Sequence, residues 1–385
     1  MSSAKLALST RGKIRVGIIG VGNWANFGHL PVLDLLPEYE VVAVFARRRA
    51  AAEEAAARFK IRYVLDSAEE LVRHPEVDLV LILSTAPQHA EHARLAIAAG
   101  KDVYTEWPLT TSTETSKALV AEAEAAGVRH IIGLQRRLAP TNRYLGDLLR
   151  DGFVGKLRSV RIHVSMNYFQ ARRSKALQWT VAPENFSNVI AIYAGHFLDA
   201  LFAATGRPDR ISAELINQFK AVTIVETGEV LQTTTPDQLV IAGTFGSGAV
   251  LSVHIEGGKR NNSGIQIDIT GDQGDLRITN KSAFGDPVHD YVIEGIHGDD
   301  LPLERMPIPE PYRWLPPSGL PSSVLELASL YAAFVKDLQH GTHHAPSFAD
   351  GVWMHQFLDA VDRSARSGNR QAVIEASTPA RLAAE

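Results

Sequence analysis

Cysteine is absent from this chain of 385 residues. Disulfides, thiolate nucleophiles and cysteine-ligated zinc or iron–sulfur centres are therefore excluded. The absence also fits a reducing compartment, so the sequence favours a cytoplasmic protein. The clustered histidines His340, His343 and His344 lack a spaced set of carboxylates, so no metal site is expected there.

A strong net charge and long hydrophobic runs are also missing. The formal net charge of −4 provides no electrostatic basis for binding nucleic acid or an anionic membrane. No apolar stretch approaches the roughly 20 residues of a membrane-spanning helix, and residues 1–12 contain no apolar run of signal-peptide length. With 45% hydrophobic and 21% charged residues, the composition is typical of a globular protein.

The length and the order of the sequence patterns predict two domains. The first third alternates short β-rich runs with helical stretches, and its expected strands are 14–19, 41–45, 79–83, 103–105 and 130–133. Strands and helices that alternate through short links indicate a parallel, doubly wound sheet. Residues 1–137 are therefore expected to form a Rossmann dinucleotide-binding domain.

Residues 138–385 have a different character and predict a second α/β domain for substrate binding and oligomerisation. After a helix at 142–150, alternating strands at 157–164, 211–217, 239–244, 249–255, 265–270 and 275–279 indicate a large, open, mostly antiparallel sheet. The dense apolar stretch 189–205 predicts a helix between layers. The proline-rich stretch 299–320 predicts a loop, and 323–339 and 348–367 predict two helices that pack back over the rest.

A glycine motif follows the first expected strand. The sequence Gly20-Val21-Gly22-Asn23-Trp24-Ala25 matches the G-x-G-x-x-A form of the dinucleotide fingerprint. Gly20 permits the tight turn, Gly22 lets the backbone approach a pyrophosphate, and small Ala25 allows the helix to pack near the strand. Because the motif ends a strand and opens a helix, it indicates a bound dinucleotide; a glycine turn without a ligand is the alternative.

The end of the second expected strand distinguishes between the two dinucleotides. NAD-binding proteins usually place an acidic residue there, which accepts from the ribose hydroxyls. This chain has Ala46, followed by Arg47, Arg48 and Arg49. Guanidinium groups bind a 2′-phosphate with charge-assisted hydrogen bonds, so the sequence favours NADP over NAD. The alternative is that these arginines form a solvated helix start.

Several motifs resemble those of the Gfo/Idh/MocA oxidoreductases, and they extend over nearly the whole chain. They are residues 14–25, 84–89, 99–109, 195–199 and 271–276. Segments 134–140, 235–239 and 256–259 resemble, more narrowly, the subgroup that includes the fungal galactose-pathway repressor, a regulator with this fold. The resemblance implies a Rossmann domain followed by an α/β domain with an open sheet, an NAD(P) cofactor, and sugars, inositols or related polyols as substrates.

Two catalytic positions depart from the pattern of the family. The resemblance implies a lysine after Glu106, where this chain has Trp107. It also implies an aspartate four residues before His196, where this chain has Ile192. In the family the lysine stabilises the developing alkoxide and the histidine is the general acid–base. His196 remains, and Tyr193 shares its helix face, so both are candidate catalytic residues; core packing is the alternative for each.

The remaining candidate residues surround these positions. Trp107 is expected to stack on the nicotinamide or on a sugar, or else to fill the space left by the lysine. Expected cofactor contacts are Gly20, Gly22, Asn23, Trp24, Ala25, Arg47, Arg48, Thr85, Pro87, His89, Glu106, Trp107 and Gln135. Expected substrate contacts are Trp107, Arg137, Tyr168, Lys175 and His196. Lys175 is a nearby amine able to replace the lysine, and a solvated surface position is its alternative. A salt bridge between domains is the alternative role for Arg137.

Together these features favour an NADP-dependent oxidoreductase that acts on a sugar, polyol or glycoside by hydride transfer, with a non-standard catalytic set. The alternative is a catalytically inactive protein that senses the dinucleotide and acts as a regulator. The expected partner is a small sugar-like molecule, with neither nucleic acid nor membrane. The open sheet predicts a homodimer or homotetramer formed through the second domain.

Overall fold

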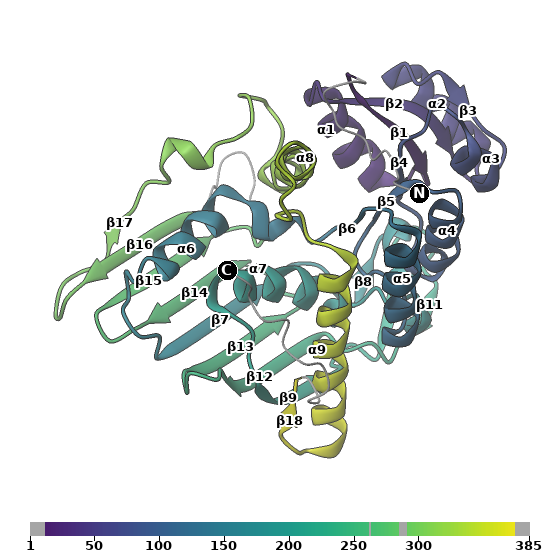
Figure 1. The fold of residues 1–385 in the computed structure, drawn as a ribbon. Helices are drawn as coiled ribbons and strands as arrows, with labels where there is room; N and C mark the ends of the chain where they lie inside the picture. The colour runs from purple at the N-terminus through teal and green to yellow at the C-terminus, as the bar shows by residue number, and fades with distance from the viewer. Residues whose placement is uncertain (1–11, 262, 285–290, 374–385) are drawn as a thin grey trace.

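The computed structural model describes residues 12–261, 263–284 and 291–373. The segment in which no signal peptide is expected therefore lies almost entirely outside the described residues. Two large sheets, joined by helices, make up the molecule (Figure 1). The first belongs to the N-terminal third of the chain and the second to the remainder.

In the described part of the chain the first sheet is parallel, as the sequence predicts, and has six strands, of which all but the two-residue β3 were expected. They are β1 (Ile14–Ile19), β2 (Tyr39–Phe45), β3 (Tyr63–Val64), β4 (Leu79–Ile82), β5 (Asp102–Thr105) and β6 (His130–Ile132), in the order β3-β2-β1-β4-β5-β6. The strand order reverses between β1 and β4. In doubly wound sheets, ligands bind at the carboxyl ends of the strands at such a point.

Helices cover both faces of this sheet. They are the π-helical turn η1 (Ala25–His29), α1 (Leu30–Leu35), α2 (Arg49–Phe59), α3 (Ala68–Arg73), α4 (Ala86–Ala98) and α5 (Thr113–Ala126). Successive side chains of β1 point to opposite faces. Ile18 is buried in the core that contains residues of α1 and α2, whereas Ile19 is buried in the core that contains residues of α3, α4 and α5. Burial on both sides explains the continuous hydrophobic runs of these strands.

The second sheet has nine strands in the described residues and is open and mostly antiparallel, as expected. They are β7 (Ser159–Ser165), β9 (Arg210–Ile216), β12 (Gln238–Thr244), β13 (Val250–Glu256), β14 (Gly264–Thr270), β15 (Gly274–Asn280), β16 (Val292–His297), β17 (Glu304–Arg305) and β18 (Gln371–Ala372). Their order is β17-β16-β15-β14-β7-β13-β12-β9-β18, and only β7 and β13 pair in parallel within the described sheet. Buried and exposed residues alternate along β12, so one face is packed and the other is solvated.

Helices lie over the packed face of this sheet (Figure 1). The connecting turn η2 (Gln135–Leu138) leads into α6 (Pro140–Arg150), and η5 (Val189–Ala194), a π-helical segment, continues as α7 (Gly195–Thr205). Contrary to the sequence prediction, the helical segment Pro183–Thr205 is long and apolar enough to cross a membrane. However, 72% of its most apolar window is buried, which is the behaviour of a core helix.

The last two long helices reach back toward the first domain. In the proline-rich stretch before them, η6 (Glu310–Tyr312) is a short 3-10 turn. Helix α8 (Ser322–His340) contacts α1 and η1, and α9 (Phe348–Ser367) contacts α5, β6 and β9. Leu327 and Tyr331 of α8 are buried in the same core as Ile18 of β1. The C-terminal part of the chain therefore contributes to the packing of the cofactor domain.

A small three-stranded sheet, which the sequence patterns did not predict, accompanies the second domain. It consists of β8 (Arg172–Arg173), β10 (Ala221–Ile224) and β11 (Val230–Gln232), and the 3-10 turns η3 (Lys175–Thr180) and η4 (Pro183–Asn185) follow β8. Its core is limited to Val181, Val222 and Ile224, with Leu231 packed against them. Strands this short carry little alternation, and these three lack the regular strand–helix order that identified the short strands of the first sheet.

Candidate functional site

The glycine motif lies in the turn after β1, at the carboxyl edge of the sheet. Gly20 has a φ of +99°, and a Cβ there would lie 2.9 Å from the backbone of Leu83 and Ser84. Only glycine suits such a conformation so close to another strand end. No atom lies within 4 Å of a Cβ built at Gly22, so this part of the backbone faces open space. The turn therefore has room for a pyrophosphate.

The residues after Gly22 begin the helix that follows the turn. Asn23 is exposed, Trp24 is partly buried, and Ala25 is buried beneath them. A helix start of this kind offers unpaired N–H groups to phosphate oxygens. The glycine turn and this helix start thus fit a dinucleotide, as the motif indicates.

Two of the three arginines after β2 are exposed and make no ion pair within the described residues. These are Arg47 and Arg48, and Arg48 is the N-cap of α2. In contrast, Arg49 forms ion pairs with Glu53 and Asp66. Positive charge at a helix N-terminus is unfavourable, and a bound anion would compensate for it. Arg47 and Arg48 are therefore the residues available for a phosphate group.

The loop after β4 supplies three of the expected cofactor residues, but they differ in exposure. Thr85 and Pro87 are exposed at the start of α4. His89 is buried, and its ring nitrogens lie 2.8 Å from the carbonyl oxygens of Pro108 and Ser84. Burial lowers the pKa of His89 despite these carbonyl contacts. In this structure His89 therefore joins two loops instead of facing a ligand.

Glu106 lies beyond the end of β5 and accepts three hydrogen bonds on one oxygen. The Tyr104 hydroxyl lies 2.6 Å, His29 Nε2 2.7 Å and the Trp24 indole nitrogen 3.3 Å from its Oε1. Burial raises the pKa of Glu106, but the hydrogen bonds from His29 and Tyr104 outweigh this effect, so the pKa is lowered. Glu106 is therefore an oriented carboxylate.

Trp107 follows a strand of the first domain, but its side chain contacts residues of the second. Its indole nitrogen donates to the carbonyl of Ala191 at 2.6 Å, and its ring centroid lies 4.9 Å from that of His355. A Cβ on Gly195 would overlap the indole, so this glycine is what admits the ring. With only 4% of Trp107 exposed, it fills space between the domains, and its ring is not available to stack on a nicotinamide or a sugar.

His196 lies in the first turn of α7, directly after Gly195. Its ring is partly buried, its Nδ1 is enclosed, and neither ring nitrogen has a hydrogen-bond partner among the described residues. Burial and the charge of Arg136 lower the pKa of His196 to about 4, although Glu106 opposes them. His196 is therefore a neutral proton acceptor at physiological pH. Burial raises the pKa of Tyr193, so its phenol stays a neutral donor.

Arg136 is a buried cation whose charge acts on His196. Its Nη1 donates to the Tyr291 hydroxyl at 2.7 Å and lies 3.5 Å from Glu326 Oε1. The guanidinium lies 4.3 Å from the ring centroid of Phe197. Its Nη2 is enclosed without a partner in the described part of the chain. A buried cation with an unused donor is suited to a ligand oxygen.

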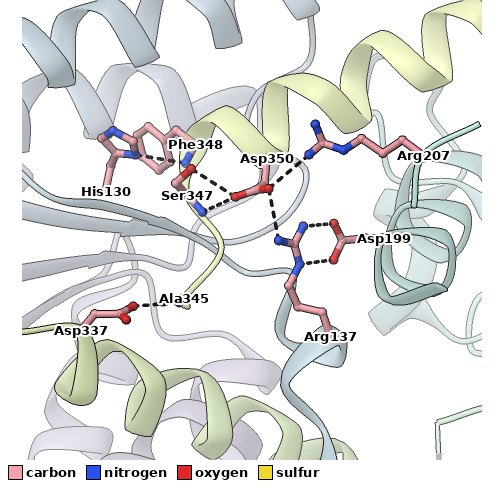
Figure 2. A network of polar contacts seen from close by, with 9 residues as sticks. All are labelled: His130, Arg137, Asp199, Arg207, Asp337, Ala345, Ser347, Phe348 and Asp350. Atoms are coloured by element: carbon pink, nitrogen blue, oxygen red, sulfur yellow. Dashed lines mark hydrogen bonds and ion pairs between the residues drawn. The ribbon is translucent and has the colours of Figure 1, made fainter. Parts of the chain in front are cut away.

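Arg137 joins the two domains through ion pairs (Figure 2). Its Nε donates to Asp199 Oδ2 at 2.9 Å, a second bond from Nη2 completes a bidentate pair, and Nη1 donates to Asp350 at 3.1 Å. Arg207 approaches the same Asp350 oxygen at 3.3 Å, and Asp350 also caps α9 with Ser347. The salt bridge between domains, which was the alternative for Arg137, is thus the observed arrangement.

A hollow of about 70 Å³ lies beside η5. It is lined by Tyr168, Phe169, Arg173, Leu177, Trp179, Thr180, Ile192 and Tyr193. Tyr168 and Trp179 are 43% and 41% exposed, so aromatic surface is open to solvent at its rim. Lys175 is exposed at the start of η3 and is not among the lining residues.

Two further features of the site differ from the sequence-based expectations. Gln135 is buried, and its Oε1 has no partner among the described residues. The residues that hold Glu106, namely His29, Tyr104 and Tyr331, were not anticipated. His29 lies four residues after the glycine motif, so its proximity to the site could have been predicted from the sequence. Tyr331 is 302 residues from His29, and no local sequence pattern indicates that the two are in contact. Within the described ranges, no three histidine or carboxylate side chains gather as a metal site would require.

Comparison with known proteins shows two family matches. Residues 14–134 match the oxidoreductase family with an NAD-binding Rossmann fold, and residues 140–280 match the C-terminal domain of Gal80p. Dehydrogenase aclE of Aspergillus oryzae is 28% identical over 377 residues, which cover 92% of this chain and 97% of the relative. Trans-1,2-dihydrobenzene-1,2-diol dehydrogenase of Mus musculus is 34% identical over 202 residues, which cover 52% of this chain and 59% of the relative.

Solved structures share the whole fold. Levoglucosan dehydrogenase in complex with NADH and levoglucosan has a TM-score of 0.83 at 21% identity and covers 94% of this chain and 99% of its own. A super-repressor mutant of Gal80p from Saccharomyces cerevisiae has a TM-score of 0.82 at 20% identity and covers 94% and 98%. At these identities the likeness shows the fold alone.

Proposed function

Because this chain belongs to the Gfo/Idh/MocA oxidoreductase family, near Gal80, we propose that it is an NADP-dependent dehydrogenase that oxidises or reduces a sugar-like ring compound. Bound NADP supplies the hydride acceptor or donor. The chain's own residues bind the two reactants, hold the reacting oxygen and transfer its proton. The names of the similar dehydrogenases, which include levoglucosan dehydrogenase, support a ring-shaped alcohol as substrate.

The observation that carries this proposal is the pair of unpaired nitrogens on Arg136 and His196. Each buried donor or acceptor without a partner costs about 1–3 kcal/mol, which a bound substrate oxygen would offset. Neutral His196 can take the proton of a substrate hydroxyl, and the Arg136 guanidinium can stabilise the negative charge that develops on that oxygen. Arg136 thus replaces the lysine whose position Trp107 occupies.

Exposed arginines support NADP rather than NAD. Arg47 and Arg48 follow β2, where the adenosine ribose lies in this fold, and neither has an ion-pair partner among the described residues. Arg47→Glu should weaken NADPH binding far more than NADH binding, and Arg73→Glu, the same charge change on α3, should alter neither. Equal loss for both dinucleotides in a fluorescence titration would contradict the assignment.

The aromatic hollow supports a substrate with a flat, partly apolar ring. Ile192 and Tyr193 of η5 form one wall, and Tyr168 and Trp179 lie at its rim. Sugar rings and cyclic diols present C–H faces that stack on aromatic side chains. Isoleucine, where the family has aspartate, removes a polar contact and makes this wall apolar.

The test is a spectrophotometric screen of the purified protein with NADP and NAD. The panel contains sugars, inositols, anhydro-sugars, aryl glycosides and cyclic trans-diols. Turnover that is lost in His196→Asn and retained in His297→Asn, a histidine at the end of β16, is the expected result. Turnover that survives in His196→Asn would refute the acid–base role.

A second candidate function is a regulator that binds the dinucleotide without turnover. The replacement of the lysine by a packed Trp107 favours it, as does the match of residues 140–280 to the Gal80p domain. Tight NADPH binding with no turnover across the whole panel would support this function. A partner protein retained only in the presence of NADPH would then identify its role.

A further inference from the structure

A buried series of hydrogen bonds connects helix α8 with the carboxylate of Glu106. The Tyr331 hydroxyl lies 2.7 Å from His29 Nδ1, and His29 Nε2 lies 2.7 Å from Glu106 Oε1. Both Tyr331 and His29 are fully buried. Buried polar groups are retained when each has a partner, and here each member satisfies the next. The second half of the chain thereby reaches the cofactor domain.

The donors around Glu106 leave its two oxygens in different situations. His29, Tyr104 and Trp24 all direct their donors at Oε1. No donor from the described residues reaches Oε2, and Oε2 is not among the enclosed unpaired atoms. The side chain is 16% exposed, so Oε2 is the oxygen open to a ligand.

The same series of hydrogen bonds determines which nitrogen of His29 carries the proton. Glu106 is a carboxylate and can only accept, so His29 donates from Nε2. His29 Nδ1 then accepts from the Tyr331 hydroxyl. Burial raises the pKa of Tyr331, which keeps this hydroxyl a neutral donor. Tyr39 donates to the Tyr331 backbone carbonyl at 2.8 Å and holds this part of α8 in place.

Strand order indicates which half of a dinucleotide Glu106 faces. Arg47, on the adenosine side, follows β2, whereas Glu106 follows β5, on the other side of β1. In a doubly wound sheet the ligand lies across the switch point between these strands. Glu106 Oε2 therefore lies on the nicotinamide side, where ribose hydroxyls can donate to it.

We propose that His29 and Tyr331 are positioning residues for the cofactor, which hold Glu106 so that its Oε2 accepts from the nicotinamide half of the dinucleotide. This inference rests on the proposed cofactor but not on turnover, and it applies equally to an enzyme and to a sensor. A structural role in packing α8 is the competing explanation. The two explanations predict different results when His29 or Tyr331 is replaced. A positioning role predicts that only contacts with the nicotinamide half are weakened, whereas a structural role predicts that binding of both halves is weakened.

The experiment compares NADPH with adenosine 2′,5′-bisphosphate, which lacks the nicotinamide half, by calorimetric titration. Tyr331→Phe removes the hydroxyl with little change of shape, and His29→Gln tests the histidine itself. Tyr39→Phe is the matched control, because it deletes a buried hydrogen bond in the same aromatic cluster without touching Glu106. Thermal melting of each variant reports its stability.

We expect Tyr331→Phe and His29→Gln to weaken NADPH binding roughly tenfold, the effect of losing one well-oriented bond to a charged group. Their affinity for adenosine 2′,5′-bisphosphate should stay at the parent value, and Tyr39→Phe should change neither affinity. Equal weakening of both ligands, or an effect of Tyr39→Phe as large as that of Tyr331→Phe, would overturn the proposal in favour of a structural role. If His29→Gln does not fold, Tyr331→Phe decides alone. Failure of the parent protein to bind NADPH is a separate result that refutes the cofactor itself.

Discussion

Arg137 offers a quantitative test of how the two domains are joined. It lies in η2, the turn that follows β6, and pairs bidentately with Asp199 on α7, which is 3% exposed. Leucine at position 137 would retain an apolar stem but leave this aspartate without its partner (Figure 2). Removing one partner of a buried ion pair costs about 3–5 kcal/mol. Because 17% of the Arg137 side chain is exposed, we expect a loss of about 3 kcal/mol for Arg137→Leu.

The loss should depend on pH in a defined direction. Burial already raises the pKa of Asp199, and Arg137 partly offsets that effect. Without Arg137 the folded-state pKa rises further above the unfolded value, so the folded variant binds a proton more tightly than its unfolded chain does. The penalty relative to the parent is therefore full at neutral pH and shrinks as the pH falls toward the raised pKa.

Urea unfolding of parent and variant at about pH 7.5 and about pH 5.5 measures both effects. Arg207→Leu is the control, because Arg207 contacts only Asp350 of this cluster and 48% of its side chain is exposed, so we expect a loss of at most about 1 kcal/mol. The double variant Arg137→Leu/Asp199→Leu should recover most of the stability, since apolar groups can replace a buried pair. A loss below about 1 kcal/mol for Arg137→Leu, the same loss at both pH values, or no recovery in the double variant would refute the reasoning.

Three further predictions concern the site itself. Gly195→Ala should destabilise the protein by about 1–3 kcal/mol in chemical denaturation, because its Cβ would overlap the Trp107 indole; unchanged stability would contradict this packing. With the pKa of His196 at about 4, kcat/KM for alcohol oxidation should stay level from neutral pH down to about pH 5 and fall only below it. A fall centred near the usual histidine pKa in the pH profile would argue against this environment. Trp179→Ala should raise KM for a ring substrate in steady-state kinetics, with kcat and NADPH affinity little changed, whereas an unchanged KM would remove Trp179 from the substrate site.

The main sheet of each domain could be predicted because its signals are local. β1 was predicted at its observed limits, and the expected second-sheet strands agree with the observed ones to within one or two residues. What was missed has weak or no periodicity. The missed strands β3, β8, β10, β11, β17 and β18 are two to four residues long, and β16, at Val292–His297, was missed as well. The π-helical turns at Ala25–His29 and Val189–Ala194 depend on packing that no local pattern shows.

The candidate site was predicted less completely than the fold. The glycine turn and the exposed arginines lie where the motifs place them. Trp107 and Arg137 were assigned ligand contacts, with interior packing and a salt bridge as alternatives, and the structure has the alternatives. The sequence shows which donors, acceptors and rings each side chain has. Whether they contact a ligand or other residues of the protein depends on where the fold buries them.

The sequence by itself determined the Rossmann domain and its dinucleotide turn, because the requirement for glycine at Gly20 is a matter of backbone geometry within a few residues. Only the tertiary structure decided that Trp107 packs between the domains and that Glu106 is held from α8. Those outcomes depend on contacts between segments that are far apart in the chain, such as His29 and Tyr331, which are 302 residues apart. The free energy of such contacts comes from burial and hydrogen bonding between the segments, which neither segment specifies alone.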